Sequence, residues 1–247
     1  MNLEDFFREN QEVALAFSGG VDSAYLLYAA GKYAARVRAY YVKTAFQPQF
    51  EYEDALRLTQ ELGADLRVLE MDVLSDDTVR ANPSDRCYYC KHRIFGAICE
   101  AAREDGFVVV LDGTNASDDE GDRPGMRALR ERSVRSPLRE CGLTKARIRE
   151  LSKEAGLFTW DKPAYACLAT RIPSGTELTA EKLRRTEAAE EYLFSLGLTD
   201  FRVRELAGGA RVQVKPEQFA AVLERREEIE RKLKEWYPFA VLDLTAR

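Results

Sequence analysis

A short, glycine-rich polar segment has the residue types of a phosphate-binding loop. It stands between an apolar strand expected at 13–17 and an amphipathic helix, and it reads Ser18-Gly19-Gly20-Val21-Asp22-Ser23. Two glycines let the backbone approach an anion closely, while the helix N-terminus and the serine hydroxyls supply hydrogen-bond donors. A carboxylate suits this place when it orients Mg²⁺ or the loop's own amides. The sequence therefore predicts a nucleotide pyrophosphate site. The alternative is a plain Gly-rich turn, and the Walker pattern G-x-x-x-x-G-K-[ST] is absent.

The cysteines are the second group that could do chemistry. The chain has 5 cysteines and 1 histidine. A single His excludes the two-His zinc and iron sites and leaves only His92 for a nucleophile relay. Cys87 and Cys90 form a CxxC pair without the second pair that a zinc ribbon needs. If Cys167 folds back toward them, three thiolates could hold three irons of a 4Fe–4S cluster and leave the fourth iron open.

Composition bounds the class of protein. The 247 residues are 45% hydrophobic and 32% charged, and the net charge is −5. An acidic chain lacks the electrostatic footprint of a nucleic-acid coat, so no nucleic-acid partner is expected. The first residues are acidic and polar, unlike a secretory signal, and no apolar run reaches the length of a membrane span. We therefore expect a cytoplasmic protein with reduced thiols and no membrane partner.

Strand and helix patterns alternate over the first two thirds of the chain. Apolar strands are expected at 13–17, 37–42, 66–71 and 107–112, and helices after Ser23 and at 52–62, 94–102 and 144–155. The unbroken apolar run at 107–112 is typical of a central parallel strand that is covered on both faces. This alternation predicts an α/β fold with a doubly wound parallel sheet.

The last third has a different order. A helix from Thr179 to about 196, two strands at 201–206 and 211–215, a helix at 216–237 and a strand at 239–244 indicate a smaller α+β domain. The strands are joined by Ala207-Gly208-Gly209-Ala210, which predicts a hairpin. We therefore expect an ATP-binding domain at 1–172 and a C-terminal domain at 173–247 that shapes the substrate site and supports oligomerisation.

The segment SGGVDS resembles the PP-loop of ATP pyrophosphatases, which include NAD and GMP synthetases and tRNA thiolases. The resemblance implies that the enzyme adenylates its substrate and releases pyrophosphate. It also implies that Gly113, Thr114 and Asn115, after the strand at 107–112, close over the nucleotide, the alternative being an Asx-type turn. Thr44, just past the second strand, would lie on the adenine side.

Longer motifs carry a narrower resemblance. The segment Trp160-Asp161-Lys162-Pro163-Ala164-Tyr165-Ala166-Cys167-Leu168-Ala169-Thr170-Arg171-Ile172-Pro173 is similar to a hallmark of the LarE family, and 86–91 and 136–139 agree in order. LarE proteins are ATP-dependent sulfur transferases that assemble the nickel-pincer nucleotide cofactor of lactate racemase. The resemblance covers nearly the whole chain. It implies that a pyridinium-3,5-biscarboxylic acid mononucleotide is adenylated and given sulfur, twice per product.

The resemblance leaves two sulfur sources open. In some members one Cys, matching Cys167, gives up its sulfur and becomes dehydroalanine. In others two further cysteines are thought to bind a 4Fe–4S cluster whose open iron carries sulfide from a donor. The pattern Cys87, Cys90 and Cys167 favours the cluster, and Cys99 and Cys141 are interpreted as bystanders.

Three arginines are candidates to hold the substrate phosphate. Arg202 and Arg204 alternate along one strand and share its polar face, for which a solvated surface is the alternative. Arg171 is only four residues from Cys167 in the sequence, which favours a role for it in catalysis. We expect the catalytic residues to be Cys167, Arg171 and, in the phosphate-binding loop, Asp22. Glu187 and Glu191, four residues apart on a helix, could also bind a metal, although a solvated face is the simpler interpretation.

Other functions share parts of this pattern. A tRNA thiolase would have the same loop and cysteines but usually a basic RNA-binding surface, and an amide-forming synthetase would not need the CxxC pair. A nucleotide-binding module without catalysis is a further alternative. The family resemblance also implies a homo-oligomer, by analogy a hexamer.

Overall fold

The computed structural model describes residues 2–118 and 124–247, which form two compact units. One unit takes residues up to 72 and 85–162, and the other takes 73–84 and 163–247. The expected boundary at 172/173 therefore falls inside the second unit. Residues 73–84 interrupt the first unit and belong to the second, and no pattern in the sequence predicted this excursion of the chain. Within the described residues, no helix combines the length and apolar character needed to cross a membrane.

The first unit is built on a parallel four-stranded sheet in the order β3-β2-β1-β4. Its strands are β1 (Glu12–Ala16), β2 (Arg36–Lys43), β3 (Asp65–Glu70) and β4 (Val109–Leu111). Leu15 of β1 is paired with Ala39 of β2 on one side and with Leu111 of β4 on the other. The carboxyl ends of β1, β2 and β4 therefore meet at one edge of the sheet, where the loops carry ligand-binding residues in such folds.

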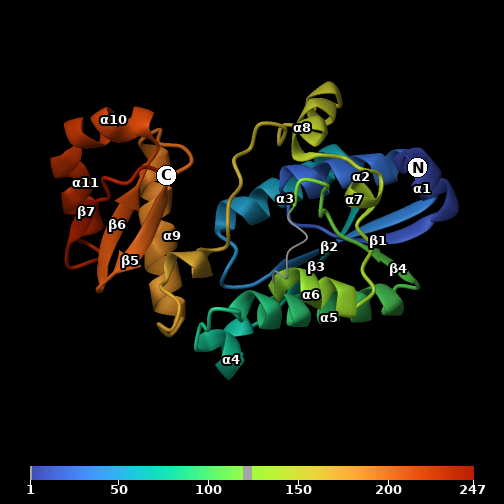
Figure 1. Ribbon diagram of the computed structural model, residues 1–247, viewed down its shortest axis with the longest axis horizontal. Coiled ribbons are helices and arrows are strands. Elements are labelled where there is room, and N and C mark those ends of the chain that lie inside the picture. The colour runs from blue at the N-terminus through green and yellow to red at the C-terminus, as the bar shows by residue number, and fades with distance from the viewer. Residues whose placement is uncertain (1, 119–123) are drawn as a thin grey trace. The chain divides into compact units, whose positions relative to one another are not determined.

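Helices cover both faces of this sheet (Figure 1). The helices are α1 (Leu3–Glu9), α2 (Val21–Tyr33), α3 (Gln49–Glu61), α7 (Pro137–Glu140) and α8 (Lys145–Glu154) on one face, and α5 (Arg86–Glu104) with α6 (Pro124–Glu131) on the other. Successive residues of β1 serve the two cores: Leu15 packs with the α2 side and Ala14 with the α5 side. Because both faces are buried, β1 and β4 and the second half of β2 are apolar without alternation. The predicted doubly wound α/β fold is confirmed.

The prediction that 107–112 forms a central strand is wrong. Among the described residues β4 is paired along its length with β1 alone, and Val108 is 94% exposed. On the outer side the described chain contributes a single bridge, in which Arg135 N donates to Val110 O and Asp112 N donates to Arg135 O, each at 2.9 Å. The helices that cover both faces of the sheet explain why 107–112 is apolar. Whether a strand is central or at the edge of the sheet has no comparable sequence pattern.

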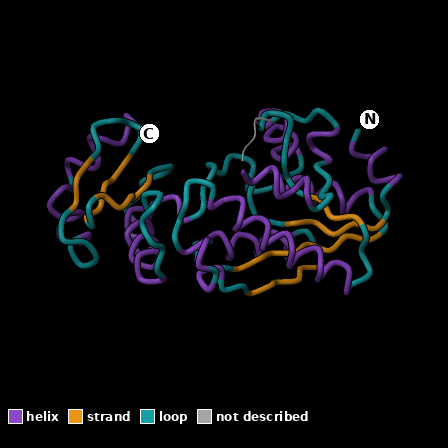
Figure 2. Tube along the Cα trace, turned by 60° about the horizontal axis from the view of Figure 1, so that its bottom comes forward, coloured by secondary structure: helices purple, strands orange, loops and turns teal. Residues whose placement is uncertain are grey.

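The second unit contains a three-stranded sheet in the order β5-β6-β7 (orange traces, Figure 2). Its elements are α4 (Asp77–Arg80), α9 (Ala180–Ser195), β5 (Arg202–Leu206), β6 (Gly209–Gln213), α10 (Phe219–Glu224), α11 (Arg226–Leu233) and β7 (Ala240–Leu242). The hairpin turns at Ala207 and Gly208, which both have positive φ, so the connection is shorter than predicted. The single helix expected at 216–237 is wrong: the chain leaves helical geometry at Arg225, whose guanidinium bonds to Glu228.

Asn82 joins the excursion at 73–84 to the segment that follows Cys167. Its side chain is fully buried, its φ is 55°, and Nδ2 donates to the carbonyl oxygens of Pro173 (2.9 Å) and Thr176 (3.1 Å). In return its own carbonyl accepts from Gly175 N at 2.8 Å. A left-handed backbone with a donor that reaches several carbonyls suits Asn better than other residues with a side chain.

The Asn82→Ala substitution is expected to destabilise the second unit by about 2–4 kcal/mol, because buried carbonyls lose their donor and a strained φ remains. Urea unfolding followed by fluorescence measures the change. Asp77→Asn, on the exposed face of α4, is the matched control and should unfold like wild type. Equal unfolding midpoints for Asn82→Ala and wild type would show that this contact contributes little.

Candidate active site

The loop after β1 folds back on itself through its two serines. Ser18 Oγ and Ser23 Oγ lie 3.1 Å apart, and Ser23 Oγ donates to Gly20 O at 3.1 Å. Gly20 is the N-cap of α2 and offers no side-chain cap, which leaves the helix N-terminus open to an anion. Gly19 has a φ of 73°, and a Cβ there would lie 3.2 Å from the Cβ of Ala55. The loop therefore requires glycine at this position.

Asp22 stands in the first turn of α2 as a partly paired carboxylate. Its Oδ2 accepts from Lys145 Nζ at 2.6 Å, whereas Oδ1 is buried and has no hydrogen-bond partner within the described chain. Burial raises the pKa of Asp22, and the Lys145 ammonium only partly opposes this. A buried carboxylate oxygen without a partner, beside a loop suited to phosphates, fits Mg²⁺ chemically.

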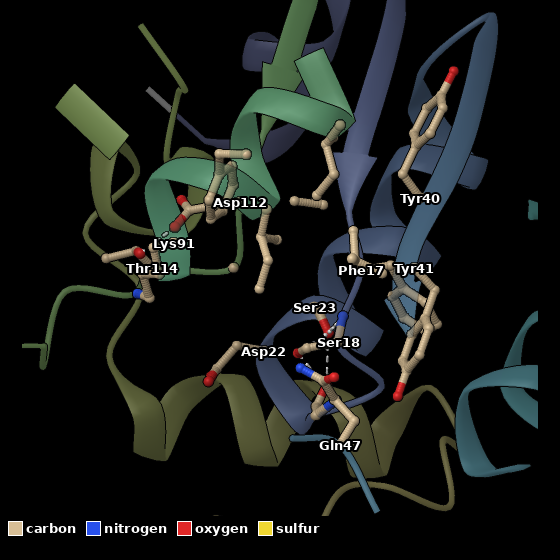
Figure 3. Close-up of a pocket in the computed structure, with 17 residues that line it drawn as sticks. Phe17, Ser18, Asp22, Ser23, Tyr40, Tyr41, Gln47, Lys91, Asp112 and Thr114 are labelled. Carbon is tan, nitrogen blue, oxygen red and sulfur yellow. Dashed lines mark hydrogen bonds between the residues drawn. The ribbon is translucent and has the colours of Figure 1, made fainter. Parts of the chain in front are cut away.

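The loop opens onto a cavity of about 310 Å³ in the first unit (Figure 3). Its lining joins the PP-loop, the end of β2, one face of α5 and the loop after β4: Ala16, Phe17, Ser18, Gly20, Asp22, Ser23, Tyr40, Tyr41, Val42, Gln47, Lys91, Ile94, Phe95, Ile98, Asp112, Gly113 and Thr114. Aromatic and aliphatic side chains from β2 and α5 give the cavity an apolar part, while hydroxyl, amide and charged groups supply polar contacts. Such a lining suits a nucleotide.

The loop after β4 approaches the PP-loop closely at Gly113. A Cβ on Gly113 would lie 3.0 Å from Ser23 N, so only glycine fits without a shift. Asp112 organises the neighbours, because it accepts from Ser136 Oγ at 2.6 Å and from the hydroxyl of Thr114. Gly113 and Thr114 line the cavity. Asn115 is not among the lining residues, and its Oδ1 accepts from Ser117 N at 2.8 Å, which is the Asx-type turn.

Thr44 supports a neighbour and is not itself part of the lining. Its hydroxyl donates to Gln47 Oε1 at 2.7 Å and accepts from Phe46 N at 3.0 Å. Gln47 lines the cavity in its place. The sequence interpretation missed Gln47, Tyr41, Lys91 and Lys145. Gln47 could have been found from its place in the same loop as Thr44, whereas Lys145 lies 123 residues from its partner Asp22 and has no such signal.

Cys87 and Cys90 lie within the first two turns of α5, three residues apart on one side of the helix. Cys87 is exposed and Cys90 half-buried, and their thiols suit iron as a metal. Cys167 belongs to the second unit, where it precedes the short turn Leu168–Arg171. Across the described residues, no group of three or more His, Cys, Asp or Glu side chains could hold a metal ion. Burial raises the pKa of the Cys99 and Cys141 thiols, which lowers their reactivity.

Arg171 is buried beside Cys167 and forms an ion pair with Glu190 of α9. Arg171 Nε donates to Glu190 Oε1 at 2.8 Å, and Nη2 donates to Oε2 at 3.1 Å. Glu190, which is buried, is the acidic residue of α9 that meets this site, whereas Glu191 is exposed. The guanidinium expected to bind a phosphate is therefore already occupied by a carboxylate.

Arg202 and Arg204 extend the positive charge along β5. Arg202 is buried and donates to Ala164 O at 2.8 Å, and Arg204 Nε donates to Gln213 Oε1 at 2.7 Å. Burial and the nearby Arg171 lower the pKa of Arg202 to about 10, and the same causes lower the pKa of Arg204. Glu190 pairs with Arg171, and Asp200 lies 3.9 Å from Arg202 but also pairs with Lys215 and Arg247. The arginines therefore leave an excess of positive charge that an anion would neutralise.

Comparisons with known proteins place the chain in a family. The family model described as asparagine synthase matches residues 4–244. Uncharacterized protein slr1717 of Synechocystis is 38% identical over 221 residues, which cover 88% of this chain and 81% of that protein. Pyridinium-3,5-bisthiocarboxylic acid mononucleotide synthase of Lactiplantibacillus plantarum is 34% identical over 240 residues, 96% of this chain and 87% of the synthase. The chain therefore belongs to the PP-loop superfamily and, within it, to the LarE family of ATP-dependent sulfur transferases.

Proposed function

We propose that this enzyme uses ATP to adenylate the carboxylates of pyridinium-3,5-biscarboxylic acid mononucleotide and converts them to thiocarboxylates. The observation that carries the proposal is the cavity whose phosphate end combines the Ser18–Ser23 loop with the unpartnered oxygen of Asp22. The 34% identity to the L. plantarum synthase supports the choice of substrate. The test is to supply ATP, Mg²⁺, a sulfide source and the substrate, and to follow pyrophosphate together with the mass of the product.

In the adenylation step, the triphosphate lies on the serine hydroxyls of the loop and the open N-terminus of α2. A substrate carboxylate oxygen attacks the α-phosphorus, the bond between the α-phosphorus and the bridging oxygen breaks, and pyrophosphate leaves. Mg²⁺ on Asp22 would neutralise charge that develops on the phosphates. Gly113 and Thr114 cover the nucleotide, Thr44 orients Gln47 beside it, and Asn115 fixes the shape of the covering loop.

In the sulfur step, the acyl carbon accepts sulfur and AMP leaves with the electrons of the broken carbon–oxygen bond. Arg202 and Arg204 would hold the phosphate of the mononucleotide, since their burial and mutual repulsion favour an anionic ligand. Cys167 delivers the sulfur in one of two ways. In the first, its thiolate attacks the acyl carbon, and the Cβ–Sγ bond then breaks by β-elimination as the Cα proton is lost, which leaves the thiocarboxylate and dehydroalanine. In the second, Cys167 is a ligand of a cluster with Cys87 and Cys90, and the sulfur comes from an external donor. When bound, such a cluster would present sulfide at its open iron.

Gly113→Ala is expected to weaken ATP binding by about 10- to 100-fold, because the added methyl pushes the covering loop away from Ser23. Calorimetric titration with ATP–Mg²⁺ measures this. Gly31→Ala, at another glycine without a positive φ, where a Cβ meets nothing within 4 Å, is the control for adding a methyl group. Unchanged affinity in Gly113→Ala would place the nucleotide away from this loop.

The sulfur source is tested by iron and acid-labile sulfide in protein purified without oxygen. About four irons per chain, lost in both Cys87→Ala and Cys167→Ala, are expected if the three cysteines hold a cluster. Cys141→Ala should keep the iron of wild type. Iron-free protein that makes product and loses the mass of H₂S at Cys167 would instead establish Cys167 as a single-use donor.

A further inference from the structure

The Arg171 guanidinium has almost no donor left for a ligand. Its side chain is 0% exposed, and two of its N–H groups are directed at the carboxylate of Glu190. Nη1 donates to Ala166 O and to Thr170 Oγ1, each at 2.8 Å, and approaches Cys167 O at 3.4 Å. Four of the five N–H donors of the guanidinium thus have buried partners, so a phosphate could bind Arg171 through two donors only by displacing one of these partners.

The donors that do not face Glu190 are used to hold the backbone around Cys167. Cys167 O also accepts from Thr170 N at 3.0 Å and from Thr170 Oγ1 at 2.8 Å. Thr170 Oγ1 thus accepts from Arg171 and donates to Cys167 O, which links the two residues a second time. The peptide that carries the thiol is therefore fixed by side-chain contacts and by the turn that follows it.

Glu190 connects this assembly to strand β5. Its Oε1 accepts from Val203 N at 2.8 Å, and its Oε2 accepts from the hydroxyl of Tyr165. The ring of Tyr165 lies against the guanidinium groups of Arg171 and Arg202, at 4.5 Å and 5.0 Å from its centroid. Val203 stands between Arg202 and Arg204 on β5, so the same carboxylate that holds Arg171 also holds the strand that bears the two arginines.

We propose that Arg171 and Glu190 are positioning residues, which hold Cys167 in a fixed geometry relative to Arg202 and Arg204 and do not contact the substrate. This inference rests on the proposed function, in which Cys167 delivers sulfur and the two arginines hold the phosphate of the mononucleotide. Sulfur transfer needs the sulfur and the acyl carbon in one geometry, and a displacement of about 1 Å can cost about 100-fold in rate. A rigid link between the two groups would provide that geometry.

Arg171→Lys tests the inference, because it keeps the charge but cannot bridge Glu190 and the two carbonyls. We expect thiocarboxylate formation in a single turnover to fall at least about 30-fold, while the KM of the substrate in pyrophosphate release stays within about twofold of wild type. Amide hydrogen exchange should rise in 166–172 and stay unchanged in 209–213. A raised KM with normal sulfur transfer would show that Arg171 binds the phosphate, and unchanged transfer and exchange would show that it has no role.

Two further variants separate positioning from loss of folding. Arg185→Lys alters a comparable ion pair, between Arg185 of α9 and Glu205 of β5, and should leave transfer and exchange in 166–172 unchanged. Thr170→Val removes only the link from Arg171 through the Thr170 hydroxyl to Cys167 O. This variant should melt like wild type and lose less sulfur transfer than Arg171→Lys does. Normal transfer and normal exchange in Thr170→Val would count against the inference. Hydrogen exchange requires no substrate, so it tests whether Arg171 and Glu190 hold the backbone around Cys167 independently of the reaction. If wild type failed to release pyrophosphate with the mononucleotide, that result would refute the proposed function alone.

Discussion

Cys167→Ser is expected to abolish thiocarboxylate formation, by on the order of 10³-fold or more, while one turnover of pyrophosphate release continues. In the proposed function both sulfur sources require this thiol, since Cys167 would be either the donor itself or one of three cluster ligands. The adenylation cavity lies wholly in the first unit and does not include Cys167, so its chemistry is expected to survive. Rapid quench with separate assays of pyrophosphate and thiocarboxylate measures both halves of the reaction.

Cys141→Ser is the matched control, because Cys141 is half-buried and its burial raises the thiol pKa. It should transfer sulfur at the rate of wild type. If Cys167→Ser made thiocarboxylate normally, sulfur would have to reach the acyl carbon by a route without this residue. Loss of pyrophosphate release together with transfer would indicate that Cys167 acts earlier, in substrate binding.

Local patterns in the sequence predicted the fold and the strand–loop–helix geometry around residues 18–23 well. The sequence Ser18 to Ser23 contains everything its geometry needs: a preceding strand, glycines at the close approaches and a helix that starts at Val21. The same holds for the helix predicted to begin at 144, where Thr144 is the N-cap of α8 and its hydroxyl accepts from Arg147 N. These features depend on neighbours within a few residues, which a sequence displays directly.

Features set by distant contacts were not predictable in this way. The edge position of β4 depends on which segments lie beside it, and the pairing of Lys145 with Asp22 depends on α8 packing beside α2. Arg171 illustrates the difference most clearly. Its type and its place near Cys167 suggest phosphate binding, but the position of Glu190 on another element determines where its donors go.

Asp22→Asn is expected to slow pyrophosphate release on the order of 10²- to 10³-fold, a loss of a few kcal/mol of transition-state stabilisation. The amide keeps the shape of the side chain but supplies neither the charge nor the second oxygen that a cation requires. The remaining activity should respond weakly to Mg²⁺. A Mg²⁺ titration of pyrophosphate release, at saturating ATP, measures both effects. Asp54→Asn removes a carboxylate that pairs with Lys162 and does not line the cavity, and it should behave as wild type.

The same substitution should not destabilise the fold, which separates a role in chemistry from a role in folding. Burial raises the folded-state pKa of Asp22, so the folded chain binds the proton more tightly than the unfolded chain does. Stability therefore falls as pH rises from the ordinary Asp pKa through the raised value, and above that value the cost of the buried charge is fully present. A neutral amide removes that cost, so without nucleotide Asp22→Asn should melt at or above the wild-type temperature. A lower melting temperature together with normal Mg²⁺ dependence would mean that Asp22 serves to hold Lys145 and the loop, and that the cation binds elsewhere.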